Sequence, residues 1–361
     1  MPGDSIGRLF RVTVWGESHG PAAGAVIEGC PPGIKLDHER INRALSRRKP
    51  GGKFVSARGE DDRFEILSGL FKGKTTGTPV SIIIKNTAAK SENYTELENL
   101  LRPGHGDFTY LEKYGVRDYR GGGRSSARLT APVVAAGAIA SQFLQEVRGI
   151  DILAWLKSVG NVTADIESTA ISREIVQASC INFPDSEAEK NALDLMEKLR
   201  IRGDSTGGVV ECRIIGVPSG LGEPLFNGLD ADLGAAITGL NAVKGFEIGN
   251  GFDASLLTGS ENNDEFTCEN GRITLATNRC GGVLGGISTG TPLVFRAAFK
   301  PAPSISVNQN TVDIHGRPAE ISVSGQHDVC VAVRAVPVVE ALAAIVVMDH
   351  LLRHRGQCGV R

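Results

Sequence analysis

Two histidines of this chain stand in glycine-rich turns, where a side chain can act close to a bound ligand. His19 lies in Gly16-Glu17-Ser18-His19-Gly20, ahead of a short apolar run, and His105 lies in Arg102-Pro103-Gly104-His105-Gly106-Asp107. Imidazole titrates near neutrality, so His19 is a candidate general acid. Beside His105, an arginine and an aspartate could hold an anion and the ring in one place. Each turn can also be interpreted as a water-facing surface turn, and both interpretations stay open.

A third segment has the composition of a phosphate site. Gly121-Gly122-Gly123 precedes Arg124-Ser125-Ser126-Ala127-Arg128, directly before a predicted helix. Glycines expose backbone N–H groups, serines add hydroxyls, and a helix N-terminus favours negative charge. The segment lacks G-K-[ST] and no strand precedes it, so it is neither a P-loop nor a dinucleotide fingerprint. The alternative is a flexible basic loop.

Two later segments complete the candidate site. Lys300-Pro301-Ala302-Pro303-Ser304 is either a rigid turn or a ligand contact, and Gln326-His327-Asp328 sets a carboxylate beside an imidazole. Such a pair is a plausible base, although it often only caps a helix. Together the segments predict a phosphate-binding and proton-transfer site that has neither a nucleophile nor a metal. Because the seven cysteines contain no C-x-x-C pair, a zinc site and a disulfide framework are disfavoured.

Composition limits the function further. The 361 residues carry a formal net charge of −2, which disfavours a nucleic-acid partner or an anionic membrane surface. The N-terminus has no long apolar stretch typical of a signal peptide, and residues 336–352 are interrupted by Glu340, Asp349 and His350. We therefore expect a cytoplasmic protein, in which residues 336–352 form a buried core helix.

The chain contains an internal duplication. Residues 16–33 and 203–220 match at a constant offset, with glycines, serines and prolines coinciding. Two further pairs follow in the same order, GKTTGTPVSIII with GGISTGTPLVFR, and residues 124–140 with 331–347. We infer two copies of one unit, about 1–150 and 203–361, within a single domain, and an insertion at 151–202. His19 faces Thr206 in the second copy, so the shared backbone does not require a histidine there.

Each copy has a β-then-α rhythm that predicts an α+β fold with helices between sheets. Aspartates stand before two of the expected helices and could cap them. The expected strands are Ala22–Glu28, Val80–Lys85, Gly208–Ile215 and Leu293–Phe299, and the expected helices are Asp37–Arg48, Thr130–Val147, Asp230–Val243 and Val336–Arg353.

In their order along the chain these motifs resemble those of chorismate synthases. G-E-S-H-G, K-T-T-G-T-P, R-P-G-H, R-G-G-G-R-S-S-A-R, N-A-V-K-G, L-G-G-I-S and H-D-x-C-V-x-x-R-A-V-P cover nearly the whole chain, least well at 151–202. The resemblance implies a β-α-β sandwich with an internal pseudo-two-fold, assembled as a homotetramer. It also implies a 1,4-anti elimination of phosphate from 5-enolpyruvylshikimate 3-phosphate, dependent on reduced FMN, with an external flavin reductase or reductant and NADP as the associated nucleotide.

By the same resemblance His19 would protonate the departing phosphate, His105 would protonate or stabilise the reduced flavin, and Asp328 would assist proton removal. Substrate contacts would come from Ser18, Arg48, Arg102 and Arg128. FMN contacts would come from Arg124, Ser125, Ser126, Asn241, Ala242, Gly285, Lys300, Pro301, Ala302, Pro303, Ser304 and Gln326.

The chain departs from the family pattern at several positions. Gln326 replaces an arginine that usually contacts FMN, so we expect weaker flavin binding. Two alternatives remain, a degenerate relative that binds flavin or phosphate without catalysis and a structural platform that uses the duplicated fold. The other departures are Leu129 for glutamate, Val133 and Phe54 for arginine, with Lys53 as a possible substitute for the latter, and Val329 for proline.

Overall fold

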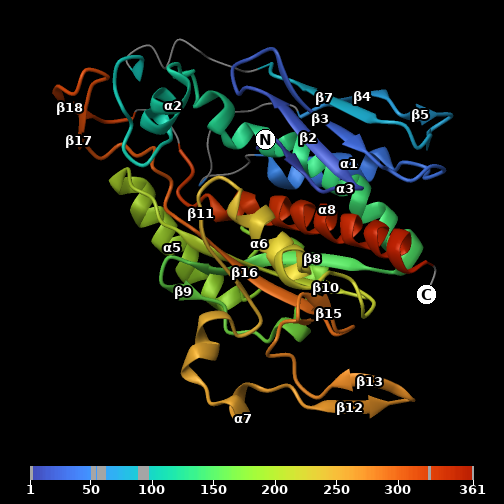
Figure 1. Cartoon of the computed structure of the whole chain (residues 1–361). Helices are drawn as coiled ribbons and strands as arrows, with labels where there is room; N and C mark the ends of the chain where they lie inside the picture. Colours follow the sequence, from blue (N-terminus) through green and yellow to red (C-terminus); the bar gives the residue numbers. More distant parts are fainter. Residues whose placement is uncertain (1–2, 50–53, 55–61, 88–96, 324–326, 360–361) are drawn as a thin grey trace.

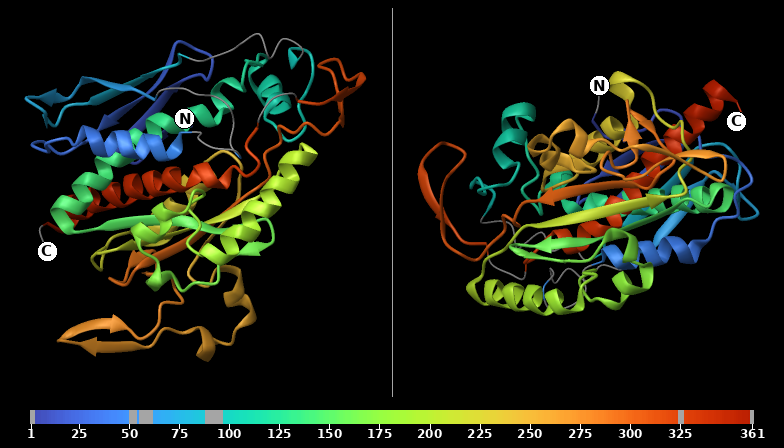
Figure 2. Two further views of the ribbon diagram at one scale, coloured as in Figure 1. Left: turned by 180° about the vertical axis from the view of Figure 1, so that it is seen from behind. Right: turned by 90° about the horizontal axis from the view of Figure 1, so that it is seen from below.

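The computed structural model describes residues 3–49, 54, 62–87, 97–323 and 327–359. Two antiparallel sheets enclose a layer of helices, which confirms the predicted α+β class and β-α-β sandwich (Figure 1). The two further views show the same layers from behind and from below (Figure 2). Residues 249–280 project from the second sheet as a separate excursion (Figure 1).

The first sheet is built by strands between residues 5 and 85, in the order β1-β2-β3-β7-β4. Its inner face is apolar because alternate side chains of a strand point to the same side: Val80, Ile82 and Ile84 are fully buried. The predicted strands Ala22–Glu28 and Val80–Lys85 are confirmed. The five strands are β1 (Ser5–Ile6), β2 (Arg11–Gly16), β3 (Ala22–Glu28), β4 (Phe64–Ser68) and β7 (Val80–Lys85).

The second sheet has the order β11-β16-β10-β8-β9. The predicted strands Gly208–Ile215 and Leu293–Phe299 are confirmed as its central pair. Residues 151–202, expected as an insertion, begin with two strands of this sheet, so the sheet starts at Asp151 and not at residue 203. Its strands are β8 (Asp151–Val159), β9 (Val162–Thr163), β10 (Gly208–Ile215), β11 (Val243–Ile248) and β16 (Leu293–Phe299).

Two long helices, one from each half of the chain, form the centre of the helix layer. In α3 (Thr130–Arg148), Gly137 packs so closely on Ala341 of α8 (Ala332–Cys358) that a Cβ at Gly137 would lie 2.4 Å from the Ala341 Cα. Helix α8 starts four residues before the predicted position and contains Pro337. Since proline has no N–H, the Val333 carbonyl lacks its helical donor, and the Asn182 side chain donates to it at 3.3 Å.

Two shorter helices pack against the two long ones. The Asp37 carboxylate caps α1 (His38–Arg48) by accepting from the Arg40 N–H at 3.0 Å, as predicted. Helix α6 (Leu229–Thr238) differs from the prediction: it begins behind Gly228, without a side-chain cap, and ends before β11. Asp230 therefore lies inside its first turn, where negative charge is favourable.

Helices α3 and α8 belong to segments, Ala127–Arg148 and Ala332–Cys358, that are long and apolar enough to cross a membrane by length and composition alone. Of the most apolar windows, 83% and 89% is buried inside the fold. Both therefore pack as core helices, as expected for residues 336–352.

The repeated T-G-T-P motif makes the same turn twice. The Thr76 and Thr78 hydroxyls are 2.7 Å apart, and so are those of Thr289 and Thr291. This motif is therefore structural. The remaining elements are α2 (Asp107–Tyr114), α4 (Arg173–Ala178), α5 (Ser186–Arg202), α7 (Gly259–Asn262) and the hairpin pairs β5 (Leu70–Phe71) with β6 (Lys74–Thr75), β12 (Phe266–Glu269) with β13 (Arg272–Leu275), β14 (Val283–Leu284) with β15 (Ile287–Ser288), and β17 (Gln309–Val312) with β18 (Pro318–Ile321).

Candidate active site

A cavity of about 430 Å³ brings most of the predicted site residues together. It lies where the glycine-rich turn before α3, the turn before α2, the end of β16 and the start of α8 converge. The volume is in the range usual for small-molecule sites. The predicted site residues in its lining are Arg48, Arg102, His105, Ser125, Ser126, Asn241, Ala242, Lys300, Ala302, Pro303, Ser304 and Asp328.

Cations dominate the described lining. Arg48, Arg102, Lys244, Lys300 and Arg334 face a single carboxylate, that of Asp328. In surroundings of low dielectric such an excess favours an anionic ligand. The pKa of Lys300 is lowered by burial and by Lys244, which indicates that this cation too would gain from a negative ligand.

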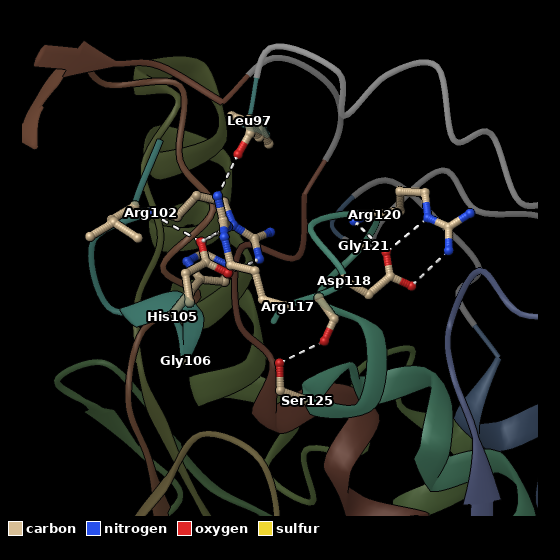
Figure 3. A network of polar contacts seen from close by, with 12 residues as sticks. Leu97, Arg102, His105, Gly106, Arg117, Asp118, Arg120, Gly121 and Ser125 are labelled. Carbon is tan, nitrogen blue, oxygen red and sulfur yellow. Dashed lines mark hydrogen bonds and ion pairs between the residues drawn. The ribbon is translucent and has the colours of Figure 1, made fainter. Parts of the chain in front are cut away.

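Arg102 is held by a buried carboxylate (Figure 3). Asp107 accepts from the Arg102 Nε and Nη2, each at 2.8 Å, and Arg117 approaches the same carboxylate at 3.2 Å. Both arginines lower the Asp107 pKa against the effect of its burial. Arg117 in turn donates to the backbone carbonyls of residues 97, 98 and 100. The guanidinium of Arg102 is thereby fixed before a ligand arrives.

Arg48 has an unusual buried environment. Its Nη2 donates to Asp62, whose other oxygen accepts from Arg128, and all three side chains are 3% exposed. The two guanidiniums lower the Asp62 pKa, although burial opposes them. The Arg48 Nε is buried and has no hydrogen-bond partner among the described residues. A buried N–H without a partner is costly, so this donor fits an anionic ligand in the cavity.

His105 joins the two halves of the molecule at the cavity. Its Nδ1 lies 3.1 Å from the Pro103 carbonyl and its Nε2 lies 3.0 Å from the Ser304 Oγ. Burial, followed by the charge of Arg102, lowers the His105 pKa to about 4. The ring is therefore neutral at pH 7. A carbonyl can only accept, so Nδ1 carries the proton and Nε2 accepts from Ser304.

Asp328 is fixed by an arginine on the first turn of α8. The Arg334 Nη1 lies 2.9 Å from the Asp328 carboxylate, and the Arg334 Nε donates to the Arg48 backbone carbonyl at 3.3 Å. Arg334 therefore ties the candidate base to the end of α1. Its fork has the geometry that suits carboxylate and phosphate recognition.

His19 lies one layer behind the cavity wall. A Cβ placed on Gly121, which lines the cavity, would lie 2.6 Å from the His19 Nε2. Ser18 is fully buried, and its hydroxyl donates to the carbonyls of Arg120 and Gly121 at 3.2 and 3.3 Å. The His19 turn and the triple-glycine turn are thus packed together, with no room for a side chain between them.

The other predicted flavin contacts divide into two groups. Asn241 donates to the Ser125 carbonyl at 2.6 Å, and Ala242 holds a left-handed φ of 68° at the cavity. Lys300 donates to the Gly104 carbonyl. Outside the described lining, Arg124 pairs with Asp4 and Pro301 lies beside the cavity segment; Gly285 lies apart at the β14–β15 hairpin. Gln326 lies outside the described residues.

A neighbouring hollow of about 600 Å³ shares Ser125, Thr130, Leu240 and Asn241 with the cavity. Two of the departures from the family pattern, Leu129 and Val133, line this hollow. We place the chemistry in the smaller cavity because it holds His105, Asp328 and the excess of cations. Phe54, a third departure, contributes its carbonyl to the Val329 N–H at 3.1 Å.

Sequence reasoning missed four polar residues of this region: Asp62, Asn86, Lys244 and Arg334. Lys244 and Arg334 belong to quoted motifs, N-A-V-K-G and H-D-x-C-V-x-x-R, and their basic side chains were the available signal. Asp62 and Asn86 gave no signal, since their importance depends on contacts far along the chain. Among the described residues no group of three histidine, cysteine or acidic side chains is placed to hold a metal ion.

Comparison with known proteins shows which family has this sequence and this fold. A family model described as chorismate synthase matches residues 10–352. The chain is 50% identical over 360 residues to the chorismate synthase of Opitutus terrae and 49% identical over 358 residues to that of Gloeothece citriformis, covering 99% of every chain. A solved structure, described as a crystal structure of chorismate synthase, superposes with a TM-score of 0.78 at 31% identity, covering 97% of this chain and 94% of the other.

Proposed function

The chain belongs to the chorismate synthase family of carbon–oxygen lyases, and from that premise we propose that it converts 5-enolpyruvylshikimate 3-phosphate into chorismate and phosphate by a 1,4-anti elimination. This is the last step of the shikimate pathway. The observation that carries the proposal is the cavity, whose described lining has five cationic side chains, one carboxylate and the neutral His105. A substrate with a phosphate and two carboxylates matches that excess of positive charge.

The residues of the cavity also fit FMN. Ser125, Ser126, Asn241, Ala242 and the segment Lys300–Ser304 would hold it. The Arg48 Nε, for which the described part of the chain offers no hydrogen-bond partner, supports an anionic ligand beside them. Reduced FMN, when bound, supplies electron density that no side chain can provide. We expect its affinity to be lowered by Gln326, because an amide makes no charge-assisted contact. A Gln326→Arg variant should then bind FMN more tightly.

The protein's own groups divide the remaining work. Arg48, Arg102 and Arg334 neutralise the substrate's anionic groups. His19 donates a proton to the departing phosphate, which a small movement of the Gly121 turn brings within reach. Asp328, oriented by Arg334, assists removal of the ring proton. His105 presents Nε2 as a proton acceptor, and the negative charge of bound ligands raises its pKa from the low value of the empty site.

We further propose a cytoplasmic homotetramer that receives reduced flavin from an external reductase or reductant, with NADP(H) as the electron source. Large apolar side chains at the surface support contacts between subunits: Leu225, Phe226, Phe252, Leu256 and Ile273 are each at least 78% exposed. Patches of this kind mark association surfaces. Leu225 and Phe226 lie in the turn before α6, and the other three belong to the excursion of residues 249–280.

Anaerobic incubation with the substrate and chemically reduced FMN tests the reaction. Equal release of phosphate and chorismate is expected, with no turnover when FMN is oxidised and a large loss in His19→Ala. A folded protein that binds FMN but yields no product at high FMN would favour the alternative, a flavin- or phosphate-binding relative without catalysis.

A further inference from the structure

A second basic pocket, which we call the arginine hollow, lies between α1, α3, α4, α8 and the start of β8. It has a volume of about 300 Å³, and its described lining shares no residue with that of the cavity. Small and apolar residues of α3 and α8, among them Gly137 and Ala341, line one part of it. The charged residues of its described lining are Arg40, Arg43, Arg47, Arg173, Asp151 and Glu340.

We propose that the arginine hollow binds a phosphate dianion, either as the free ion or as the head of a small phosphate ester. Four guanidiniums and two carboxylates in its described lining leave a formal charge of +2, which a dianion balances. The volume is at the lower end of the range for small-molecule sites and therefore suits a compact ligand. This site is separate from the reaction proposed above and does not depend on it.

Helix α1 supplies three of the four arginines from one face. Arg40, Arg43 and Arg47 follow one another at spacings of three and four positions, which bring side chains to the same side of a helix. Like charges at these spacings destabilise a helix. An anion in the hollow would relieve this repulsion, so its binding should stabilise the fold.

Arg40 and Arg173 bring like charges together from two different helices. Burial, followed by the charge of Arg173, lowers the pKa of Arg40, although Asp151 opposes this effect. The hydrogen bonds of Arg40 go to neutral groups: its Nη1 donates to the Gln145 Oε1 at 2.6 Å and its Nη2 to the Ser141 Oγ at 3.0 Å. Neutral acceptors leave its charge uncompensated. A dianion close to both guanidiniums would add two attractions in surroundings that are partly apolar.

The other two inner contacts show that the hollow is rigid. The Glu340 Oε1 accepts from the Arg47 Nη2 at 3.1 Å and from a backbone N–H of β8 at 3.0 Å. Arg173 donates to Asp151 at 2.7 Å and to a backbone carbonyl of β8 at 2.8 Å. The Arg47 Nε is buried and finds no hydrogen-bond partner in the part of the chain that the structure describes. The guanidiniums are thus held in place before an anion arrives, which reduces the entropy lost on binding.

The matched variants Ser141→Glu and Ser141→Gln test the proposal, because they have the same size and differ only in charge. Ser141 lines the hollow from α3 and already accepts from Arg40. In low salt without phosphate, urea unfolding should require more urea for Ser141→Glu than for Ser141→Gln. Inorganic phosphate at about 10 mM, compared with sodium chloride of equal ionic strength, should then stabilise Ser141→Gln more than Ser141→Glu, since only the former keeps the site.

Equilibrium dialysis with radiolabelled inorganic phosphate gives the second measurement. The double variant Arg40→Gln with Arg173→Gln should bind one phosphate fewer per chain than its control, Arg200→Gln with Arg317→Gln, which removes two positive charges from ion pairs elsewhere. Ser141→Glu should likewise bind one fewer than Ser141→Gln. These differences do not depend on whether the cavity also takes phosphate, so they remain decisive if the proposed reaction fails.

Competition distinguishes the two sources of the ligand. Glycerol 3-phosphate that displaces the label from Ser141→Gln more effectively than unlabelled phosphate would indicate a phosphate ester, and a weaker effect would indicate the free ion. Either of two results would overturn the proposal: equal numbers of bound phosphates in the hollow variants and their controls, or displacement by sodium chloride as effective as that by phosphate at equal ionic strength.

Discussion

The His105 Nε2 and the Ser304 Oγ lie 3.0 Å apart although 199 positions separate the two residues in the chain. One lies within residues 1–150 and the other within residues 203–361. The cavity is thus lined by side chains from both halves of the chain, with α3 and α8 between the sheets. Each copy supplies groups that the other lacks at the equivalent place, as His19 opposite Thr206 illustrates.

The buried, neutral His105 should make stability depend on pH. Its pKa is about 4 in the folded protein and near 6.5 when unfolded, so between these values the unfolded chain binds the extra proton. The free energy of unfolding should fall as pH drops from about 6.5 to 4, by up to about 1.4 kcal/mol per pH unit from this group. Urea unfolding at pH 7, 6 and 5 measures the slope.

His105→Asn provides the comparison, because it removes the titrating ring. Asp62 and Asp107, whose pKa values are lowered, also make the protein less stable in acid, but they are present in both proteins. The difference in slope therefore isolates His105. Parallel slopes in the two proteins would contradict a low pKa for this ring.

Gly121→Ala should displace His19. Its Cβ would lie 2.6 Å from the His19 Nε2, and the backbone has a φ of +61°, which disfavours any side chain. Gly115→Ala is the control, because its φ is +69° with nothing within 4 Å of the added Cβ. Both variants should lose about 1–2 kcal/mol of stability. Only Gly121→Ala should also lose about 100-fold in kcat. Equal kcat values in the two variants would show that contact with Gly121 does not place His19.

Arg334→Gln should weaken substrate binding and release Asp328. The guanidinium bonds Asp328 and the Arg48 carbonyl and also lines the cavity, so its loss should raise KM by about 10- to 100-fold. Arg334→Lys should recover little, because one ammonium cannot make both contacts. Arg317→Gln, which breaks an exposed pair with Asp313, should leave the kinetics unchanged. Full activity in Arg334→Lys would contradict this prediction, because it would show that the site requires a positive charge here but not the forked guanidinium.

Local patterns predicted the strands well, because each of Ala22–Glu28, Val80–Lys85, Gly208–Ile215 and Leu293–Phe299 is a buried apolar run ended by turn residues. Residues 151–159 were harder. They form β8, but without a counterpart motif in the first copy they were interpreted as the start of an insertion. Helix α6 was predicted too long, because the apolar pattern continues through the turn at Gly239 into β11.

For the site, motif order along the chain identified most of the lining, but not the support behind it. No spacing rule links Asp62 to Arg128, or Asn86 to the His19 turn, since these contacts are made by packing between distant segments. Gly285 was assigned to the flavin contacts by resemblance. It lies at the β14–β15 hairpin, outside the described lining of the cavity.

Gly137→Ala should show how closely the two copies are packed. The added Cβ would lie 2.4 Å from both the Cα and the Cβ of Ala341, and since one of these is a backbone atom the helices α3 and α8 would have to separate. Overpacking of this kind should cost about 3 kcal/mol, although alanine has the better helix propensity. Gly356→Ala in α8, where nothing lies within 4 Å, should instead gain about 0.5 kcal/mol. Urea unfolding of both variants gives the comparison.

Because the cavity takes side chains from both halves of the chain, separation of α3 from α8 should also weaken FMN binding in Gly137→Ala and not in Gly356→Ala. A Gly137→Ala protein as stable as the wild type would mean that the helix layer can yield at its centre without cost, and that the contact with Ala341 does not fix the distance between the copies.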